Sequence, residues 1–237
     1  NSCIWKLRHK SGHHSFPNIL DNDPDLKQSI IARIFPNAQK LGFHRYQHFY
    51  IPALYSFYTI NWVYIRDFID LADKHIRSKM SGFEVVSFFI FKFIFFGIFI
   101  FAPIFIGGLS WQIVLTANVC MHISASYFLT IALVPSHVCE HSVFPMPDER
   151  GILPYSWSHH QVITTSDYAT DSRFMTWLLG GFNHHVVHHL FPEVSHVHYF
   201  NLTPVVKRTI VQYNLPYQHL NSIFKAYISH FYLLKNR

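Results

Sequence analysis

Two long apolar segments, joined by a short turn, constrain this chain more than any other feature. Residues 85–106 contain one charged residue, Lys92, and residues 111–134 contain none. A helix of about 20 residues crosses the apolar core of a bilayer, so each segment is long enough to span a membrane. The Gly-Gly-Leu-Ser turn between them allows only a hairpin, which places residues 84 and 135 on the same side. Lys92 has no evident partner in the sequence and would be costly at mid-depth, but it lies near the start of its span and can extend to the membrane surface.

The composition agrees with a membrane enzyme that also has a polar region. Of the 237 residues, 50% are hydrophobic and 14% are charged. This is too apolar for an ordinary soluble domain and too charged for a bundle of spans alone. The net charge is +6, and 11 of the 19 Lys and Arg residues precede residue 82. That placement is typical of a cytoplasmic, membrane-facing segment and gives no basic stripe for a nucleic acid.

Residues 49–65 are apolar but less suited to spanning a membrane. They include Pro52, Asn61 and seven aromatic residues, and aromatic richness is typical of the membrane interface. If histidines on both sides of the hydrophobic region bind one metal centre, the number of crossings between them must be even. We therefore expect two spans, with residues 49–81 forming amphipathic helices in the interface.

Histidine is unusually frequent, with 19 copies that fall mostly in clusters. The most specific cluster is His185, His188 and His189. On a helix, positions i, i+3 and i+4 share one face, so three imidazoles can converge on a metal ion. A single H-x-x-H-H pattern is equally consistent with a solvated histidine patch, and both interpretations stay open for this cluster alone.

A second cluster consists of His9, His13 and His14. Positions i and i+4 align on a helix, and i+5 lies about 100 degrees further round, which allows ligands to one metal ion and to its neighbour. Ser11 and Gly12 could equally mark a loop. Two such clusters on either side of a membrane hairpin nevertheless favour a shared metal centre.

A third group, His137 and His141, follows the second apolar segment at i, i+4 spacing. A lone histidine at a helix end is often a cap or an interfacial residue, but this position is where a metal site at the membrane surface would lie. We expect His137 to be a ligand and favour it over His141. The other histidines near the clusters are expected to orient ligands or to form polar surface: His159, His160, His184, His196 and His198.

At these residues the sequence resembles the membrane fatty-acid desaturase family, particularly its acyl-lipid and linoleoyl-CoA, front-end type. The shared features are W-x-x-x-H-x-x-x-H-H from Trp5, a D-x-D-P-D-L run, the hairpin, the His137 element and G-G-x-N-x-x-x-x-H-H-L-F-P-x-x-S-H-x-H-Y from Gly180. They cover nearly the whole chain, and the last string is long and specific. The segment from Gln161 to Thr165 is similar to the family's linker into the last histidine box. Many front-end members have Gln where this chain has His185, so the subtype does not define the double-bond position.

The resemblance implies an oxidoreductase that uses O2 to insert a cis double bond into the acyl chain of a fatty acyl-CoA or acyl-lipid. It implies two iron ions, an electron donor of the cytochrome b5 or ferredoxin type, and an integral membrane protein of the bacterial inner membrane or endoplasmic reticulum with its active site on the cytoplasmic face. The metal ligands that it implies, of which the last three are also the catalytic residues, are His9, His13, His14, His137, His185, His188 and His189.

The predicted fold is all-α, with a transmembrane helical hairpin and a helical cytoplasmic cap that carries the histidine boxes. We expect one domain, 1–237, divided into the second histidine box region (1–48), interfacial helices (49–81), two transmembrane helices (85–106 and 111–134) and the cap with the last box (135–237). The family's first box, H-x-x-x-H, is absent and is expected upstream of Asn1. The chain alone is therefore expected to bind iron incompletely and to be inactive.

Several other functions use similar residues. A related di-iron lipid hydroxylase or ketolase, or a sphingolipid desaturase, would need the same ligands, and product analysis separates them. A haem-binding membrane protein would need histidines at matching depth on facing spans, and only His122 lies deep within a span. A non-catalytic, zinc-stabilised membrane protein would lack an open metal site and a substrate tunnel.

Overall fold

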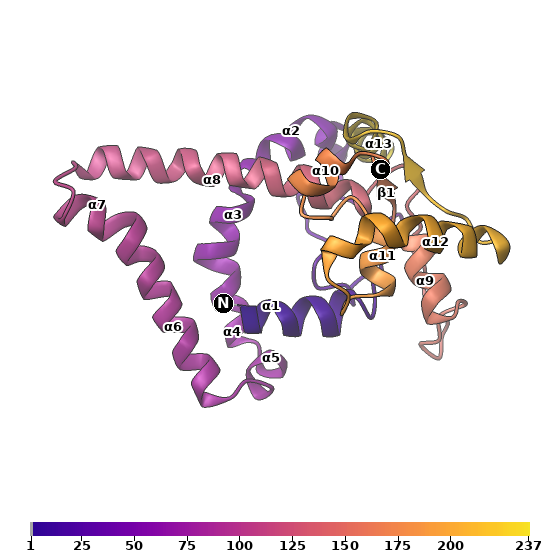
Figure 1. Ribbon diagram of the computed structural model, residues 1–237, viewed down its shortest axis with the longest axis horizontal. Helices are drawn as coiled ribbons and strands as arrows, with labels where there is room; N and C mark the ends of the chain where they lie inside the picture. The colour runs from indigo at the N-terminus through magenta and orange to yellow at the C-terminus, as the bar shows by residue number, and fades with distance from the viewer. Residues whose placement is uncertain (1) are drawn as a thin grey trace. The chain divides into compact units, whose positions relative to one another are not determined.

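The computed structural model describes residues 2–237, which are mainly helical (Figure 1). The chain divides into two compact units. The first unit consists of the chain up to His9 together with Ala53–Leu129, and the second consists of Lys10–Pro52 and Thr130–Arg237. Each unit is a set of helices around its own packed core.

The first unit contains the two long apolar helices. Gly82–Phe105 is a continuous helical segment of 24 residues and Trp111–Ser136 one of 26, and among residues 2–237 these two are long and apolar enough to cross a membrane. The predicted helices at 85–106 and 111–134 are thus confirmed, with small shifts at their ends. The helices of this unit are α1 (Ser2–Arg8), α3 (Tyr58–Asn61), α4 (Asp67–Ala72), α5 (Lys74–Ser78), α6 (Gly82–Phe96), α7 (Ala102–Phe105) and α8 (Trp111–Leu133), whose last residues enter the second unit.

The first apolar helix begins three residues earlier than predicted because its N-terminus is capped. The Ser81 hydroxyl accepts a hydrogen bond from the Glu84 backbone N–H at 3.2 Å, and the Glu84 carboxylate accepts one from the Ser81 N–H at 2.7 Å. This reciprocal pair satisfies backbone donors that a helix start leaves unbonded. At the other end, Gly108 turns the chain toward α8 with φ of 65°, a conformation that side chains with a Cβ rarely adopt.

Lys92 is buried inside the first unit beside a partner that the sequence did not indicate, and its depth in the membrane stays a prediction. Its ammonium group is 2.7 Å from a carboxylate oxygen of Asp67, and both residues are buried. It also donates to the carbonyl of Val63. The partner carboxylate comes from α4, which sequence spacing could not place beside α6. A buried ammonium is stable here because it is paired and hydrogen-bonded.

The segment predicted to form interfacial helices, residues 49–81, is helical for most of its length, as α2 (Gln47–Leu54), α3, α4 and α5 with irregular turns at Tyr55–Phe57 and Trp62–Arg66. Within the first unit it packs on α8, where the Thr59 hydroxyl lies 3.0 Å from Nδ1 of His122 and 2.8 Å from the Ser126 hydroxyl. Its position in the membrane interface stays a prediction.

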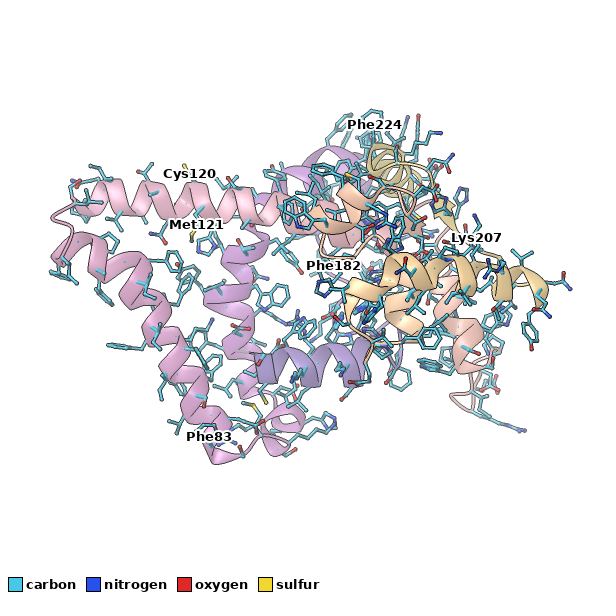
Figure 2. The ribbon with its side chains drawn as sticks, in the orientation of Figure 1. Phe83, Cys120, Met121, Phe182, Lys207 and Phe224 are labelled. Carbon is cyan, nitrogen blue, oxygen red and sulfur yellow. The ribbon has the colours of Figure 1, made fainter. Side chains whose placement is uncertain are left out.

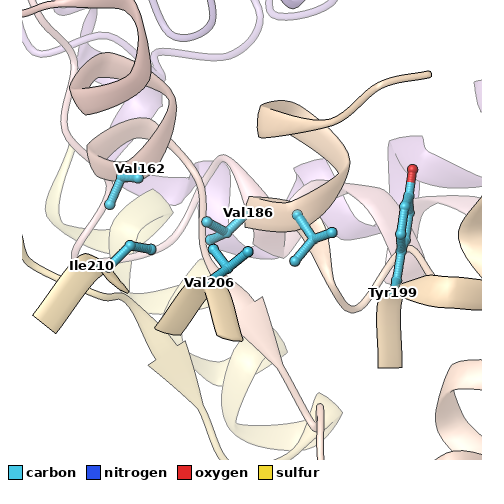
Figure 3. Packing of buried hydrophobic residues seen from close by; sticks show 6 residues of the cluster. Val162, Val186, Tyr199, Val206 and Ile210 are labelled. Carbon is cyan, nitrogen blue, oxygen red and sulfur yellow. The ribbon is translucent and has the colours of Figure 1, made fainter. Parts of the chain in front are cut away.

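The second unit packs short helices around a small apolar core. This core consists of Val162 from α9, Val186 and Val187 from α11, and Tyr199, Val206 and Ile210 from α12 (Figure 3). Helix α11 therefore packs against both α9 and α12. The elements of this unit are α2, α9 (Trp157–Thr164), β1 (Asp167–Tyr168), α10 (Arg173–Leu178), α11 (His185–Leu190), α12 (Tyr199–Gln212), β2 (His219–Leu220) and α13 (Ile223–Asn236), with 3-10 turns at Gly42–Tyr46, Val134–Ser136 and His196–His198.

The structure is mainly helical, as predicted, and it also contains one short parallel pair, β1 and β2. Asp167 lies opposite His219, and Tyr168 opposite Leu220. The backbone N–H of Asp167 donates to the Gln218 carbonyl at 3.0 Å. Two residues are too few for a periodic signal, so the pairing depends on contacts between segments that are distant in the sequence.

Candidate metal centre

Four buried histidines converge in the second unit: His13, His137, His185 and His189. Nε2 of His137 is 3.0 Å from Nε2 of His13, 2.7 Å from that of His185 and 3.1 Å from that of His189. The ligand atoms of the four rings all lie within 4.8 Å of one another. Three segments that are far apart in the sequence thus point the same ring nitrogen at one volume.

The other nitrogen of each ring faces a hydrogen-bond acceptor. The acceptors are a carboxylate oxygen of Asp23 for His13 (2.9 Å), the carbonyl of Thr164 for His137 (3.2 Å), the carbonyl of Phe182 for His185 (3.3 Å) and the side-chain oxygen of Gln161 for His189 (2.8 Å). Phe182, labelled in Figure 2, lies just before α11. Because these oxygens carry no proton, Nδ1 is the protonated nitrogen in each neutral ring. All four Nε2 atoms therefore present bare lone pairs.

Four lone pairs that face one another repel unless a cation lies between them. Burial, and then the neighbouring histidines, hold the pKa values of His185 and His189 well below their usual range. These two rings are therefore neutral, which is the form that binds metal ions. Imidazole ligands suit iron, zinc, copper and nickel. The donor set fits a transition-metal ion.

Each ligand is positioned by a local structural feature. In α11, His185 and His189 are one helical turn apart and share a face, as the spacing predicted. His137 follows the 3-10 turn that ends the second apolar helix. His13 ends a π-helical turn, His9–His13, and such turns are frequent at functional sites.

Asp23 and Asn18 hold two of these ligands from one loop. The Asp23 carboxylate accepts the His13 ring N–H and the backbone N–H groups of Asn18 and Asp25. Asn18 has φ of 59° and donates its side-chain amide to the carbonyl of His137 at 3.1 Å. A carboxylate behind a metal-binding histidine fixes the ring orientation and raises its basicity as a ligand.

His14 and His188 lie beside the four converging histidines. The His14 ring stacks on His189, with ring centroids 4.2 Å apart, and its centroid is 4.7 Å from that of His188. The ligand atoms of His14 and His188 lie within 4.8 Å of each other. Nδ1 of His188 is 3.2 Å from the Tyr199 hydroxyl. The structure thus brings six of the seven predicted ligands together in the second unit.

The seventh predicted ligand, His9, belongs to the first unit. It is buried, and its ring stacks on Trp5 with centroids 4.6 Å apart. Its role as a ligand stays a prediction.

The other histidines near the clusters differ in burial, and His159 is half-buried. His160 and His184 are buried, and burial lowers the pKa of His184 to about 4. Nε2 of His160 bonds the Pro17 carbonyl at 2.9 Å. His196 and His198 are exposed, and so is His141, because the helix has ended before it and the chain turns. His137 and His141 therefore do not share one face of a helix, in spite of their i, i+4 spacing.

Three residues of the site were not identified individually from the sequence: Asp23, Gln161 and Asp167. Asp167 is fully buried, and burial raises the pKa of its carboxyl to about 6. Its carboxylate accepts the Val186 N–H at 2.8 Å. Asp23 and Gln161 lie in segments that the family resemblance had marked, but a segment does not say which side chain faces a ligand.

The chain is similar to known proteins over most of its length. The family model described as fatty acid desaturase matches residues 1–221. The chain is 33% identical to an acyl-lipid (8-3)-desaturase of Mortierella alpina, over 96% of this chain and 52% of that protein. It is 31% identical to an sn-1 linoleoyl-lipid 6-desaturase of Synechocystis, over 97% of this chain and 65% of that protein. A Delta(5) fatty acid desaturase A of Dictyostelium discoideum is 32% identical, over 98% and 52% respectively.

The chain spans about half to two thirds of the length of these relatives. No solved structure matches it. The family model, however, covers almost the whole chain, including every histidine of the centre. The chain belongs to the fatty acid desaturase family.

Proposed function

We propose that the protein is a membrane desaturase, an oxidoreductase that inserts a cis double bond into the acyl chain of a lipid. The observation that carries the proposal is the convergence of four histidine Nε2 atoms on one volume. In each of these rings, Nδ1 faces a hydrogen-bond acceptor. The relatives are named acyl-lipid and linoleoyl-lipid desaturases, which favours a lipid-linked substrate, with a fatty acyl-CoA as the alternative carrier.

The proposed metal content is two iron ions. Iron bound here would supply, with O2 and two electrons, the oxidising power that breaking unactivated alkyl C–H bonds requires. In the overall reaction, a CH2–CH2 unit, O2, two electrons and two protons give CH=CH and two water molecules. The proposed ligands are His13, His137, His185 and His189, with His14 and His188 toward the second iron; His9 is proposed on its sequence motif alone. His185, His188 and His189 are the proposed catalytic residues.

The protein's own groups would hold the ligand rings in one orientation throughout the reaction. Asp23 and Gln161 each accept a ring N–H from a ligand. Both acceptors are buried, so water does not compete for these bonds. A site held in this way needs little rearrangement when a metal ion binds.

For the membrane arrangement, we propose that the two apolar helices form a transmembrane hairpin. Most of their large side chains are exposed and apolar, such as Phe93 (73% exposed) and Phe105 (77%), which suits contact with lipid. Residues 135–237 and the histidine-bearing segment 1–48 would then lie at the cytoplasmic face, with residues 49–81 in the interface. A cytochrome b5-like or ferredoxin-like donor would supply electrons from that side.

The test is the fatty-acid profile of a lipid-producing host that expresses the full-length gene. A new unsaturated acid is expected, and it should disappear when His188 or His189 is changed to Ala. His75→Ala is the matched control, because His75 is exposed on α5 and belongs to none of the histidine clusters. A hydroxylated acid would change the reaction class but keep the metal centre. No new lipid, in cells where the protein is present with iron and a donor, would overturn the proposal.

A further inference from the structure

One buried segment, residues 161–168, contacts every element that carries the His137, His185 and His189 ligands. It comprises the last part of α9, a short link and β1. Every residue in it is buried. A segment that is hidden from solvent along its whole length and links several elements can determine how those elements are held relative to one another.

The first half of the segment contacts two ligand rings directly. The side-chain oxygen of Gln161 is 2.8 Å from Nδ1 of His189, and the Thr164 carbonyl is 3.2 Å from Nδ1 of His137. Both contacts belong to the metal centre described above.

The second half contacts the backbone on either side of the ligands. The Ser166 N–H donates to the Ser136 carbonyl at 2.8 Å, directly before His137. The Tyr168 hydroxyl donates to the Ala132 carbonyl at 2.7 Å, and Tyr168 is fully buried. These bonds fix the end of the second apolar helix, from which His137 projects.

Asp167 performs the corresponding task for α11. One carboxylate oxygen accepts the N–H of Val186 at 2.8 Å, in the first turn of the helix that carries three histidines. The other oxygen accepts the Tyr217 hydroxyl at 2.7 Å. The backbone of Asp167 is held at the same time, because its N–H donates to Gln218 in the β1–β2 pair.

The geometry of Asp167 suits positioning better than general stabilisation. A buried carboxylate is costly unless it is fully hydrogen-bonded, and an apolar side chain could fill the same space. Here both oxygens are used, one on the start of α11 and one on Tyr217. Because α11 has only six residues, a rotation at its first turn moves His185 and His189 together. Such a short helix has little stability of its own to resist that rotation.

We propose that Asp167 and Tyr217 form a positioning pair that sets the rotation of α11, and thereby the distances of His185 and His189 from His137. Neither residue is a ligand or touches the reacting atoms. This inference rests on the proposed function, since it assumes that the converging histidines bind iron. It predicts that the pair controls metal affinity and ligand geometry more than it controls folding.

The experiment is titration of the metal-free, full-length protein with Fe(II) under anaerobic conditions, and with Co(II), whose visible absorption reports ligand geometry. The variants are Asp167→Asn, which keeps the shape but removes the charge, and Tyr217→Phe, which removes only the hydroxyl. Tyr213→Phe is the matched control, because Tyr213 is 71% exposed. Thermal unfolding of the metal-free proteins is measured in parallel.

Asp167→Asn should weaken metal binding by roughly tenfold, at the lower end of the effect of residues behind metal ligands, and should alter the Co(II) spectrum. Tyr217→Phe should produce a smaller change in the same direction, with little change in the unfolding temperature, and Tyr213→Phe should change neither. If Asp167→Asn fails to fold, the metal affinity and Co(II) spectrum of Tyr217→Phe decide whether the pair has the proposed role.

Wild-type metal affinity and an unaltered Co(II) spectrum in the decisive variant would overturn the positioning pair and leave the proposed function intact. Wild-type protein that binds neither metal would overturn both.

Discussion

In the first unit, buried charges face charges of opposite sign, whereas the second unit gathers buried histidine nitrogens that face one another. Lys92 is paired with Asp67, and Arg8 with Asp70, at 2.7 Å in each case. In the histidine centre, four buried ring nitrogens converge on one volume instead. The first arrangement pairs opposite charges within the protein, and the second could hold a cation. Burial of polar groups therefore accompanies ion pairing in the first unit and brings potential metal ligands together in the second.

The largest expected effect breaks the second unit's centre. Changing His137 to Ala removes the ring whose Nε2 lies within 3.1 Å of three others. We expect desaturation in cells to fall by more than about 100-fold and the purified protein to lose iron, because loss of a ligand should cost more than loss of a residue behind a ligand. Metal analysis and fatty-acid profiling measure this. Retained iron and product would show that the convergence is not a metal site.

The next effect breaks the first unit's ion pair. Lys92→Met leaves the Asp67 carboxylate buried without its cation, which costs about 3–5 kcal/mol in comparable buried pairs. The unfolding temperature in detergent should fall sharply, while the iron content of the protein that remains folded should not change.

The double variant Lys92→Met with Asp67→Leu is the control for this pair. Because an apolar pair replaces both charges, most of the lost stability should return. If the double variant is as unstable as the single one, the pair has a role beyond neutralising buried charge.

A smaller effect is expected where a carboxylate serves the metal centre. Asp23→Asn keeps the size of the side chain but no longer supplies the negative charge behind His13. Metal affinity should fall by roughly 10–100-fold, with unfolding of the metal-free protein changed much less. Asp148→Asn is a suitable comparison, since Asp148 is exposed and lies outside the centre. Equal losses in both variants would mean that charge in general, not the contact with His13, controls affinity.

A pH effect tests the neutral, buried histidines away from the ligands. Burial lowers the pKa of His230 to about 4, although its Nδ1 bonds the Val138 carbonyl. The unfolded chain, with an ordinary histidine pKa, therefore binds the proton first, and stability falls as the pH decreases between the two values. From about pH 7 to about pH 5 this group should cost roughly 2 kcal/mol. Between pH 7 and pH 5, wild type should lose about this much more stability than His230→Gln, which has no titrating ring. Equal losses in the two proteins, measured from melting curves, would contradict the prediction.

The smallest effect concerns the start of the first apolar helix. Ser81→Ala removes the hydroxyl that accepts the Glu84 N–H, and loss of such a cap costs about 1 kcal/mol. A slight decrease in unfolding temperature, with normal iron content, is expected. A Ser78→Ala variant, whose hydroxyl is exposed and lies outside the cap, should show less change.

Much of the candidate site could be predicted because its signals are local. The i, i+4 spacing of His185 and His189 is a helical repeat, and the structure has both on α11. The same rule fails for His137 and His141, because the helix ends before His137. The partner of Lys92 could not be predicted for a related reason: Asp67 is 25 residues away in the sequence, and spacing carries no information about such a contact.

The sequence by itself determined the two apolar helices, the clustering of histidines and the family, because composition, periodicity and motif are properties of neighbouring residues. Only the tertiary structure decided which nitrogen of each histidine faces the centre. That choice depends on Asp23, Thr164, Phe182 and Gln161, acceptors that come from three separate segments of the chain. A ring has two nitrogens of nearly equal chemistry, and the proton goes to the one that meets an acceptor, so the fold selects the lone pairs that a metal ion can use.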